Sequence, residues 1–296
     1  MIEAKFKLTE ETINVNGKTL YRIEALKDFS YIKKGDKGGF IEKEDNLSQR
    51  GDCWVYDNAK VYNNAKVFDN ADIYGNASIF GNAIVSGNAR VYGNAEVYGN
   101  AEVYGNAEVY DNAEVYDNAE VYDNAKVYHH AVVCGYAKVY DEAKVFGNAI
   151  VSGNARVYGN AWVYHYAMVY EDAEVYHYAM VYEDAEVYDN AKVFGNAEIY
   201  DNAKVFGNAE VFGNAEIRGN AEIASKSDYI VVKNWWSSGR YFTWTRSNNM
   251  WKVGCFYGTG EELIEKAYRD SNDSGKEYEK IVKYIETILK DNNADV

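Results

Sequence analysis

Most of the chain repeats one pattern of hydrophobic and polar positions, six residues long. From Val55 to Ile223 an aliphatic residue stands at every sixth position, which makes 29 consecutive hexads, (223 − 55)/6 + 1. Alanine stands two positions before each aliphatic residue, from Ala59 to Ala221. The unit reads Ala-x-Val-Tyr-Gly-Asn, and x is mostly Glu or Lys. A fixed period of this kind is the signature of a repeat architecture.

The hexad predicts a short strand followed by a corner. In a four-residue strand, alternation places Ala and Val on one face and x and Tyr on the other. Because x is usually charged, the Ala/Val face must be the inside. Gly accepts a positive φ freely and Asn tolerates it better than most side chains, so Gly-Asn or Asp-Asn supplies the corner. Strands and corners that alternate every six residues predict a parallel coil.

The pattern aliphatic-x-x-x-small-x resembles the hexapeptide repeat of left-handed parallel β-helices. The resemblance covers residues 53–224 and implies three faces, 18 residues per turn and a left-handed coil. The 29 hexads then make about nine to ten coils, and at about 4.8 Å per coil the rod is roughly 46 Å long. The wider arrangement, with ALKDF and GGFIEKEDNLSQRGDCWV before the coils, resembles repeat proteins of bacteria and their phages.

Two flanks without hexads complete a mainly β protein of three parts: an N-terminal cap (1–51), the repeat body (52–224) and a C-terminal α+β module (225–296). Asn16-Gly17, between two alternating runs, predicts a β-hairpin over the first coil. The tail predicts three short strands, DYIVVK, RYFTWT and MWKVGCF, and then two helices. Thr259 and Glu262 form a capping box for the first helix. An apolar face marks the second, at about 276–290.

The negative charge belongs to the repeat body. Residues 52–224 hold 10 Lys and Arg against 26 Asp and Glu, a balance of −16, while the whole chain carries −15. This sign argues against direct binding of nucleic acid. The N-terminus has no apolar signal segment and no run is long enough to span a bilayer. Three distant cysteines make no disulfide framework, so we expect a cytoplasmic protein without a cofactor.

Eight acidic residues gather in about one and a half coils and form a candidate binding surface, the acidic band. Glu96 stacks on Glu114 and Glu102 on Glu120, and like charges at about 5 Å cost stability. The band is either a solvated surface, a contact for a protein with a basic surface, or a DNA mimic. Over the whole rod, 16 net charges in roughly 46 Å make one per ~2.9 Å, which is sparser than the one per ~1.7 Å of duplex DNA. The members are Glu96, Glu102, Glu108, Asp111, Glu114, Asp117, Glu120 and Asp123.

Aromatic residues mark two further candidate surfaces. Residues 18 apart stack, so Tyr56 to Tyr128 and Tyr104 to Tyr176 form two outward columns. These columns either stabilise the sheets or hold a partner or a second rod. In the tail, aromatic and basic residues exceed the needs of a small core, so either they pack in the core or part of the cluster forms a recognition surface. The residues proposed for it are Trp235, Trp236, Arg240, Trp244, Arg246 and Trp251.

The resemblance also raises two catalytic hypotheses. Acyltransferases of the hexapeptide family use a catalytic His and loops that leave the coil, but no loop interrupts the 29 hexads here. Zinc carbonic anhydrases use three His. His129 and His165 share a corner two coils apart, nearly 10 Å, whereas zinc ligands lie within about 2.2 Å of the metal. These observations argue against both hypotheses, so we predict no catalytic residue and no metal and keep the acyltransferase-like fold as an alternative.

Together these patterns favour a non-enzymatic, rod-like protein-interaction module. The resemblance to phage proteins suggests an inhibitor that binds a host protein. The alternatives are an acyltransferase-like or small-ligand-binding β-helix with sites between packed subunits, or an acidic DNA mimic. A homo-oligomer is expected, a trimer by the family resemblance or a dimer.

Overall fold

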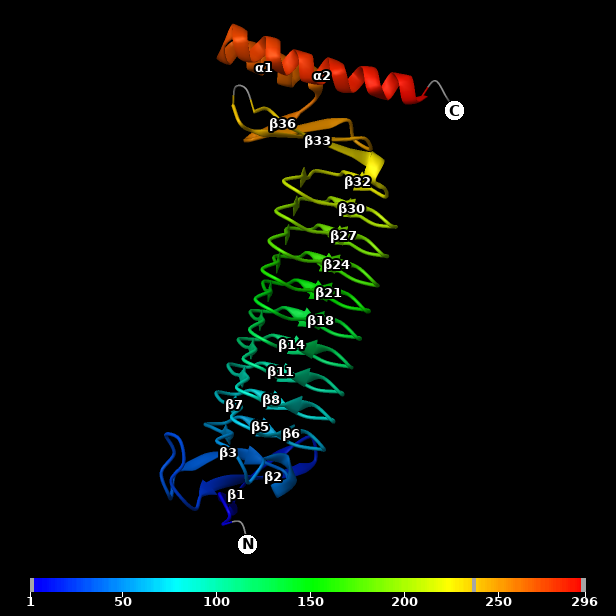
Figure 1. Cartoon of the computed structure of the whole chain (residues 1–296). Helices are drawn as coiled ribbons and strands as arrows, with labels where there is room; N and C mark the ends of the chain where they lie inside the picture. Colours follow the sequence, from blue (N-terminus) through cyan, green and yellow to red (C-terminus); the bar gives the residue numbers. More distant parts are fainter. Residues whose placement is uncertain (1–2, 236–237, 294–296) are drawn as a thin grey trace.

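The repeat body is a parallel β-solenoid (Figure 1). The computed structural model describes residues 3–235 and 238–293. Each hexad holds one two-residue strand, from β4 (Trp54–Val55) to β32 (Glu222–Ile223). Strands pair in parallel with those 18 residues away, as in Arg90↔Glu108 and Val91↔Val109. Three hexads therefore make one turn, and 29 strands make between nine and ten turns. The predicted coil is confirmed; its left hand stays a prediction from the resemblance.

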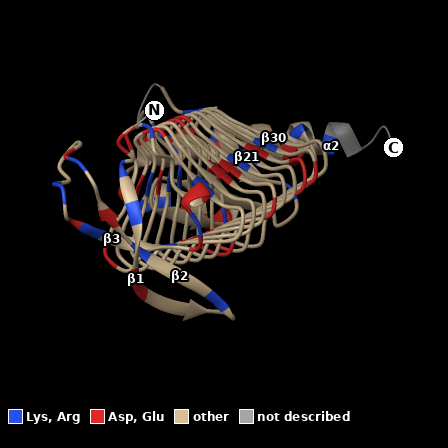
Figure 2. Cartoon of the chain, turned by 90° about the horizontal axis from the view of Figure 1, so that it is seen from below, with Lys and Arg blue, Asp and Glu red and all other residues tan. Residues whose placement is uncertain are grey.

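The three faces of the rod are named here by their sheets. Face A runs from β5 (Lys60–Val61) to β32 in the 13-stranded sheet. Face B runs from β4 to β31 (Glu216–Ile217) in the 10-stranded sheet, and face C from β6 (Lys66–Val67) to β30 (Glu210–Val211) in the nine-stranded sheet. The chain visits them in the order B, A, C. Figure 2, which looks along the rod, shows successive coils following the same outline.

From Ala59 to Ile223 the interior is built from alanine, valine and isoleucine, and Cys53 and Trp54 are buried at its N-terminal end. The alanines from Ala59 to Ala221 are all buried, and so are the aliphatic residues from Val55 to Ile223. Because these side chains are small, three strands approach closely around a narrow core. The predicted assignment of Ala and Val to the inside is confirmed.

The strands are two residues long and not the predicted four, because the first and last residues of each predicted strand belong to the corners. The amide of Ala113 donates to the carbonyl of Tyr110, 3.3 Å away, so Tyr and Ala belong to the corner. The ladder still continues around the coil. The amide of Asn112 donates to the carbonyl of His129 in the next turn, at 2.8 Å.

Each corner places one residue in the left-handed region, and it is the first corner residue, not the following Asn. Gly99 has φ 71° and Asp111 has φ 61°. The following Asn instead joins an amide ladder, as where Asn82 Nδ2 donates to Asn100 Oδ1 at 2.9 Å. A non-glycine residue in this region costs roughly 1–2 kcal/mol. Several acidic corners offset this cost, because their carboxylates accept the corner N–H of the next turn, as Asp189 does from Gly207 at 2.9 Å.

Aromatic rings stack along the faces of the rod. On face B the rings from Tyr74 to Tyr128 lie 4.7–4.8 Å apart with planes within 4°. On face C the rings from Tyr104 to Tyr176 lie 4.9 Å apart. The predicted column on face C is confirmed; on face B the stack begins at Tyr74, because the Tyr56 ring lies edge-on to Tyr74 with centroids 6.3 Å apart. On face A, Cys134 and Ser152 stand where the column would continue between Tyr116 and Tyr170, and the stack is interrupted there.

The N-terminal residues extend face A beyond the first coil. β1 (Phe6–Val15) and β2 (Lys18–Ala25) form the antiparallel hairpin predicted at Asn16-Gly17. β3 (Lys37–Ile41) pairs with β2 and, in parallel, with β5. The open end of the solenoid is thus covered by paired strands, as an exposed sheet edge requires.

Side chains bind the first coil's remaining carbonyls. Asn46 Nδ2 donates to the carbonyls of Asn63 at 3.1 Å and Ala65 at 2.9 Å. The Lys5 ammonium, buried beside the ring of Phe29, donates to the carbonyl of Cys53 at 2.8 Å. Burial lowers the pKa of Lys5. These contacts prevent the solenoid from presenting unpaired backbone oxygens at its N-terminal end.

The C-terminal module is an antiparallel sheet covered by two helices. Its strands are β33 (Tyr229–Lys233), β34 (Tyr241–Thr245), β35 (Met250–Val253) and β36 (Phe256–Gly258). The sheet lies between the last coil and helices α1 (Gly260–Asp270) and α2 (Asn272–Asn293) (Figure 1). The sequence predicted three of the strands and both helices, and the Thr259–Glu262 capping box forms.

The module also closes the rod, because its hydroxyl groups accept the amides that the last coil leaves open. The amide of Phe212 donates to the Tyr229 hydroxyl at 3.3 Å, that of Glu216 to Thr243 Oγ1 at 3.1 Å and that of Glu222 to Ser247 Oγ at 2.7 Å. Rod and module are therefore joined by specific contacts. Within the described residues, no helix is long and apolar enough to cross a membrane.

Candidate functional site

The acidic band forms as the spacing predicted, with like charges in register. Glu96 lies opposite Glu114, and Glu102 opposite Glu120. Burial and the charge of Glu114 together raise the pKa of Glu96. Glu96 and Glu102 are exposed, as are Asp117 and Asp123. This part of the band presents its charge to solvent.

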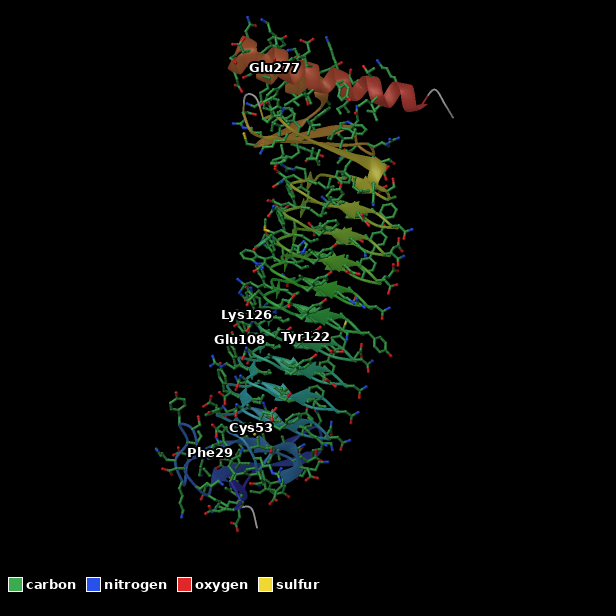
Figure 3. All side chains as sticks on the ribbon, in the orientation of Figure 1. Phe29, Cys53, Glu108, Tyr122, Lys126 and Glu277 are labelled. Carbon is green, nitrogen blue, oxygen red and sulfur yellow. The ribbon has the colours of Figure 1, made fainter. Side chains whose placement is uncertain are left out.

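Other carboxylates of the band are paired within the rod. Glu120 accepts the Tyr104 hydroxyl of the preceding coil at 3.1 Å and the Lys138 ammonium of the next coil at 2.7 Å. Glu108 is held in the same way by Tyr92 and by Lys126, which lies one coil above it in Figure 3. These carboxylates stabilise the stack.

Further members of the band contact the next corner of the rod or a tyrosine. Glu114 accepts the Tyr98 hydroxyl at 3.1 Å. The Asp117 carboxylate accepts the amide of Gly135 at 3.4 Å, and Asp111 lies 3.8 Å from the His129 ring nitrogen. The band therefore offers a partner fewer free charges than its composition suggests, which weakens the case for a DNA mimic.

The structure divides the aromatic and basic residues of the tail. Trp244 and Trp251 are each 3% exposed and pack with Phe242 in the core of the module. Buried rings cannot contact a partner, so for these two the core alternative holds and the surface prediction is wrong. Trp235, at 77% exposed, and the exposed side chains of Arg240 and Arg246 lie on the surface. The sixth residue predicted for this surface, Trp236, lies outside the described residues.

The histidines sit at corners, as the sequence indicated. His129, His165 and His177 have φ near 60° and lie edge-on to the tyrosine that precedes each of them, at 4.9 Å. The described part of the chain contains no group of three or more His, Cys, Asp or Glu side chains that could hold a metal. The geometry gives these rings a role in packing against the columns.

A different surface stands out in the middle of the rod, where the hexad departs from its usual residues. On face B, Trp162 and Met180 occupy the x position of β22 (Trp162–Val163) and β25 (Met180–Val181), with Tyr178 at the corner before β25. On face A, apolar side chains occupy the x position of three successive coils, and Tyr166 lies at the corner between the two faces. We call this surface the mid-rod patch: Val132, Ile150, Trp162, Tyr166, Met168, Tyr178 and Met180.

In the mid-rod patch Ile150, Trp162, Tyr166 and Tyr178 are exposed, and the other three side chains are half-buried. Tyr166 is 62% exposed, Tyr178 63% and Trp162 38%. A contiguous exposed apolar surface of this kind usually marks a site of interaction. On face A the interruption of the aromatic column at Cys134 and Ser152 removes the rings that flank this position elsewhere. The apolar side chains there stand beside small neighbours.

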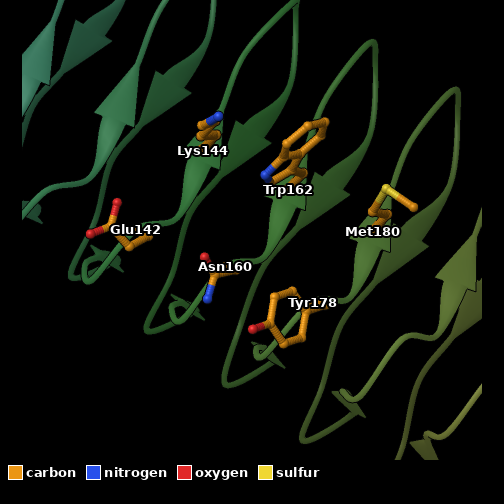
Figure 4. Close-up of a pocket in the computed structure, with 6 residues that line it drawn as sticks. All are labelled: Glu142, Lys144, Asn160, Trp162, Tyr178 and Met180. Carbon is orange, nitrogen blue, oxygen red and sulfur yellow. The ribbon is translucent and has the colours of Figure 1, made fainter.

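On face B the patch borders a shallow hollow of about 360 Å³ (Figure 4). Three successive coils line it, each with one corner residue and one x residue. The Lys144 ammonium lies 4.7 Å from the centre of the Trp162 ring, a cation–π contact. The lining residues are Glu142, Lys144, Asn160, Trp162, Tyr178 and Met180. The hollow thus combines an aromatic floor with one cation and one carboxylate at its N-terminal edge.

Comparison with known proteins supports the fold. A family model described as the YdcK beta solenoid repeat matches residues 155–171, a segment that contains Trp162, Tyr166 and Met168. A search of curated proteins finds no match to this chain. The similarity concerns one turn of the coil, so it speaks for the solenoid and not for an activity.

The mid-rod patch was missed at the sequence level although a signal was present. The segment HYAMVYEDAEVY stands at 165–176 and again at 177–188, and in both copies Met replaces the usual Glu or Lys and Tyr replaces the usual Asn. In a repeat this regular, the positions that break the pattern are the informative ones. Comparing each hexad with the consensus at the x and Asn positions would have found Trp162, Ile150 and Tyr178.

Proposed function

We propose that this chain is a non-enzymatic, rod-like protein-interaction module that binds a partner through the mid-rod patch. The exposed Trp162–Tyr166–Ile150 surface carries the proposal, because aromatic and apolar side chains free of a core role are typical of the centre of protein interfaces. The surrounding Glu, Lys and Asn side chains supply the polar rim. The partner expected on face A is a protein with a complementary apolar surface.

The ends of the rod support the same proposal. Caps at both ends hold a uniform stack, and each turn contacts only its neighbours, so the body can present side chains at fixed spacing without moving parts. The resemblance to phage repeat proteins favours an inhibitor that occupies a host protein in the cytoplasm. The acidic band and the tail surface of Trp235, Arg240 and Arg246 are secondary contacts in this proposal.

The test is capture of protein from native-host extract by immobilised chain. The face-A variant Ile150→Glu with Met168→Glu should lose a partner that the wild-type chain retains, because it places two charges at the centre of the surface. Glu102→Gln with Asp123→Asn, in the exposed part of the acidic band, and Trp235→Ser in the tail are matched controls. If the partner is lost only with the band variant or only with the tail variant, the binding site lies in that region. This result would refute binding through the mid-rod patch.

A further inference from the structure

On face B, basic residues precede the apolar pair Trp162 and Met180, and acidic residues follow it. A second copy in the reverse orientation therefore presents the opposite charge at each of these levels. From β16 (Lys126–Val127) to β31 its outward x positions read basic, basic, apolar, apolar, acidic, acidic, and the coils before them carry Asp72, Arg90 and Glu108. The six positions come from β16, β19 (Lys144–Val145), β22, β25, β28 (Glu198–Ile199) and β31: Lys126, Lys144, Trp162, Met180, Glu198 and Glu216.

We propose that two copies of this chain pack face B against face B with their rods antiparallel. The two-fold axis lies in the interface, across the rod, between the coils of Trp162 and Met180. The inference rests on the proposed role of the mid-rod patch as a contact surface, and it assigns the face-B half of that patch to a second copy. The face-A half stays available for a different protein.

The register of this dimer follows from the 18-residue turn. A two-fold axis midway between residues 162 and 180 pairs each x position with the x position of the second copy that lies equally far on the other side of the axis. The residue numbers of each such pair therefore sum to 342. Trp162 then meets Met180 of the second copy, Lys144 meets Glu198 and Lys126 meets Glu216. The pattern is isologous, so every contact occurs twice.

The neighbouring columns are compatible with the same axis. Glu142, at the corner, meets Asn196, whose amide can donate to the carboxylate. Arg218 meets Tyr128, which suits a guanidinium over an aromatic ring; within one chain Arg218 already lies 5.0 Å from the ring centre of Tyr200. The outermost ion pair is the weaker one, because Glu216 is already bound by Lys252 at 2.6 Å.

The inner ion pair, Lys144 with Glu198 of the second copy, is expected to stabilise the dimer more than the outer pair does. Lys144 and Glu198 stand three coils apart in one chain, about 14 Å, too far to pair with each other. Glu198 accepts the Tyr182 hydroxyl at 3.0 Å, and Lys144 rests against Trp162. In the dimer each of these charges gains an opposite charge beside a desolvated aromatic centre.

Other arrangements place like charges together. A parallel dimer through face B brings Lys144 to the level of Lys144 and Glu198 to the level of Glu198. An antiparallel dimer through face A, centred on Ile150, sets Glu114 against Glu186. Juxtaposed like charges suppress wrong partners. Only face B in the antiparallel orientation combines an apolar centre with complementary ends.

The expected dimer is weak. From Lys126 to Glu216 there are five steps, (216 − 126)/18, or about 24 Å, and a hexad is at most about 20 Å wide. These dimensions give about 480 Å² on each copy and about 1,000 Å² in total, at the low end for a specific interface. We therefore expect dissociation in the micromolar range.

Sedimentation equilibrium of the full chain across micromolar concentrations tests the inference by charge exchange. Lys144→Glu alone and Glu198→Lys alone each create two like-charge contacts and should weaken the dimer at least tenfold. An equimolar mixture of the two variants restores both pairs and should return to wild-type affinity as a heterodimer. Arg156→Glu on face C is the matched control and should leave the dimer unchanged; circular dichroism checks that each variant is folded.

Each outcome decides the question. A wild-type chain that stays monomeric overturns the dimer, and a mixture that does not recover overturns the antiparallel register. If the chain is monomeric while Ile150→Glu with Met168→Glu still abolishes capture of a host protein, the proposed function stands without the dimer. If both experiments fail, the mid-rod patch is not a contact surface at all.

Discussion

Replacing one interior valine by aspartate tests the inside–outside assignment on which the surfaces depend. Val109 is fully buried on face B, in register with Val91 and Val127 one coil away on either side. Its surroundings are alanine and small aliphatic side chains, so a carboxyl group placed there has no designed partner. Val109→Asp must bury either a charge or a neutral acid.

The cost follows from two contributions. A buried neutral polar group without a partner costs about 1–3 kcal/mol. To stay neutral at pH 7 the acid must bind a proton that an unfolded Asp, with a pKa near 3.9, releases, which adds about 1.36 × (7 − 3.9), or about 4 kcal/mol. We expect a loss of about 5–7 kcal/mol at pH 7.

The pH dependence separates the two contributions. A folded-state pKa above the unfolded value means that the folded variant holds the proton longer, so its stability falls as pH rises above about 4, by about 1.4 kcal/mol per unit. Val109→Thr and Val109→Asn bury polar groups that do not titrate in this range and should show no such slope. Tyr110→Asp faces outward and loses two ring stacks, about 0.5–2 kcal/mol.

Urea denaturation measures these losses, and hydrogen exchange localises them. Because each coil contacts its neighbours alone, the defect should open locally. The amide of Tyr92, which donates to the Val109 carbonyl at 3.0 Å, should lose protection before amides several coils away. Equal losses for Val109→Asp and Tyr110→Asp, or a Val109→Asp loss independent of pH, would refute the assignment.

Two further predictions test the columns and the turn. Burial and the neighbouring ring raise the pKa of Tyr110 and of Tyr122 to about 12, above the value near 10 of an unfolded tyrosine. The folded state keeps these protons longer, so the stabilisation is complete below about pH 10 and is lost between about pH 10 and 12; a denaturation midpoint constant across this window would contradict it. Deleting residues 97–114 removes one turn and deleting 97–102 one hexad, and both variants should fold, shortened by about 4.8 Å and by a third of that in solution scattering. Both should also keep the face-B dimer, whose residues follow the junction; folding of the shorter deletion alone would contradict a turn of three hexads.

The sequence predicted the rod well because one constraint acts at every hexad. Alternation of Ala and Val against charged residues permits only one inside, and the 18-residue turn then places every stacked pair, including Tyr74 on Tyr92 and Glu96 on Glu114. The sequence did not show which corner residue has the positive φ, because two residue types in the corner can adopt that conformation. Gly and Asn both tolerate positive φ, and only the structure shows that the Asn amides are used in ladders between coils instead.

The candidate sites were harder to predict because composition does not reveal partners. The sequence of the acidic band suggests unpaired carboxylates, yet Glu108 and Glu120 each bind a tyrosine hydroxyl and a lysine ammonium from adjacent coils. The tail reads as an aromatic surface, yet Trp244 and Trp251 fill the core between the sheet and the helices. Glu108 and Glu120 are bound by residues 16 and 18 positions away, and the two tryptophans are buried between the sheet and the helices. A count of charges or of aromatic rings shows neither.

Because the hexads of the rod are so similar, an x position that departs from the usual Glu or Lys points to a specific role for the residue there. An x position held by Glu or Lys is solvated and contributes to the ladder of ion pairs between coils, so replacing it by Trp, Met or Ile sacrifices those contacts. Stability of the coil does not require the replacement, since the buried Ala and Val are unchanged beneath it. We therefore propose that Trp162, Met180 and Ile150 contact another molecule. On face B the flanking charges complement a second copy, and on face A they do not, which is why one rod is expected to serve two different contacts.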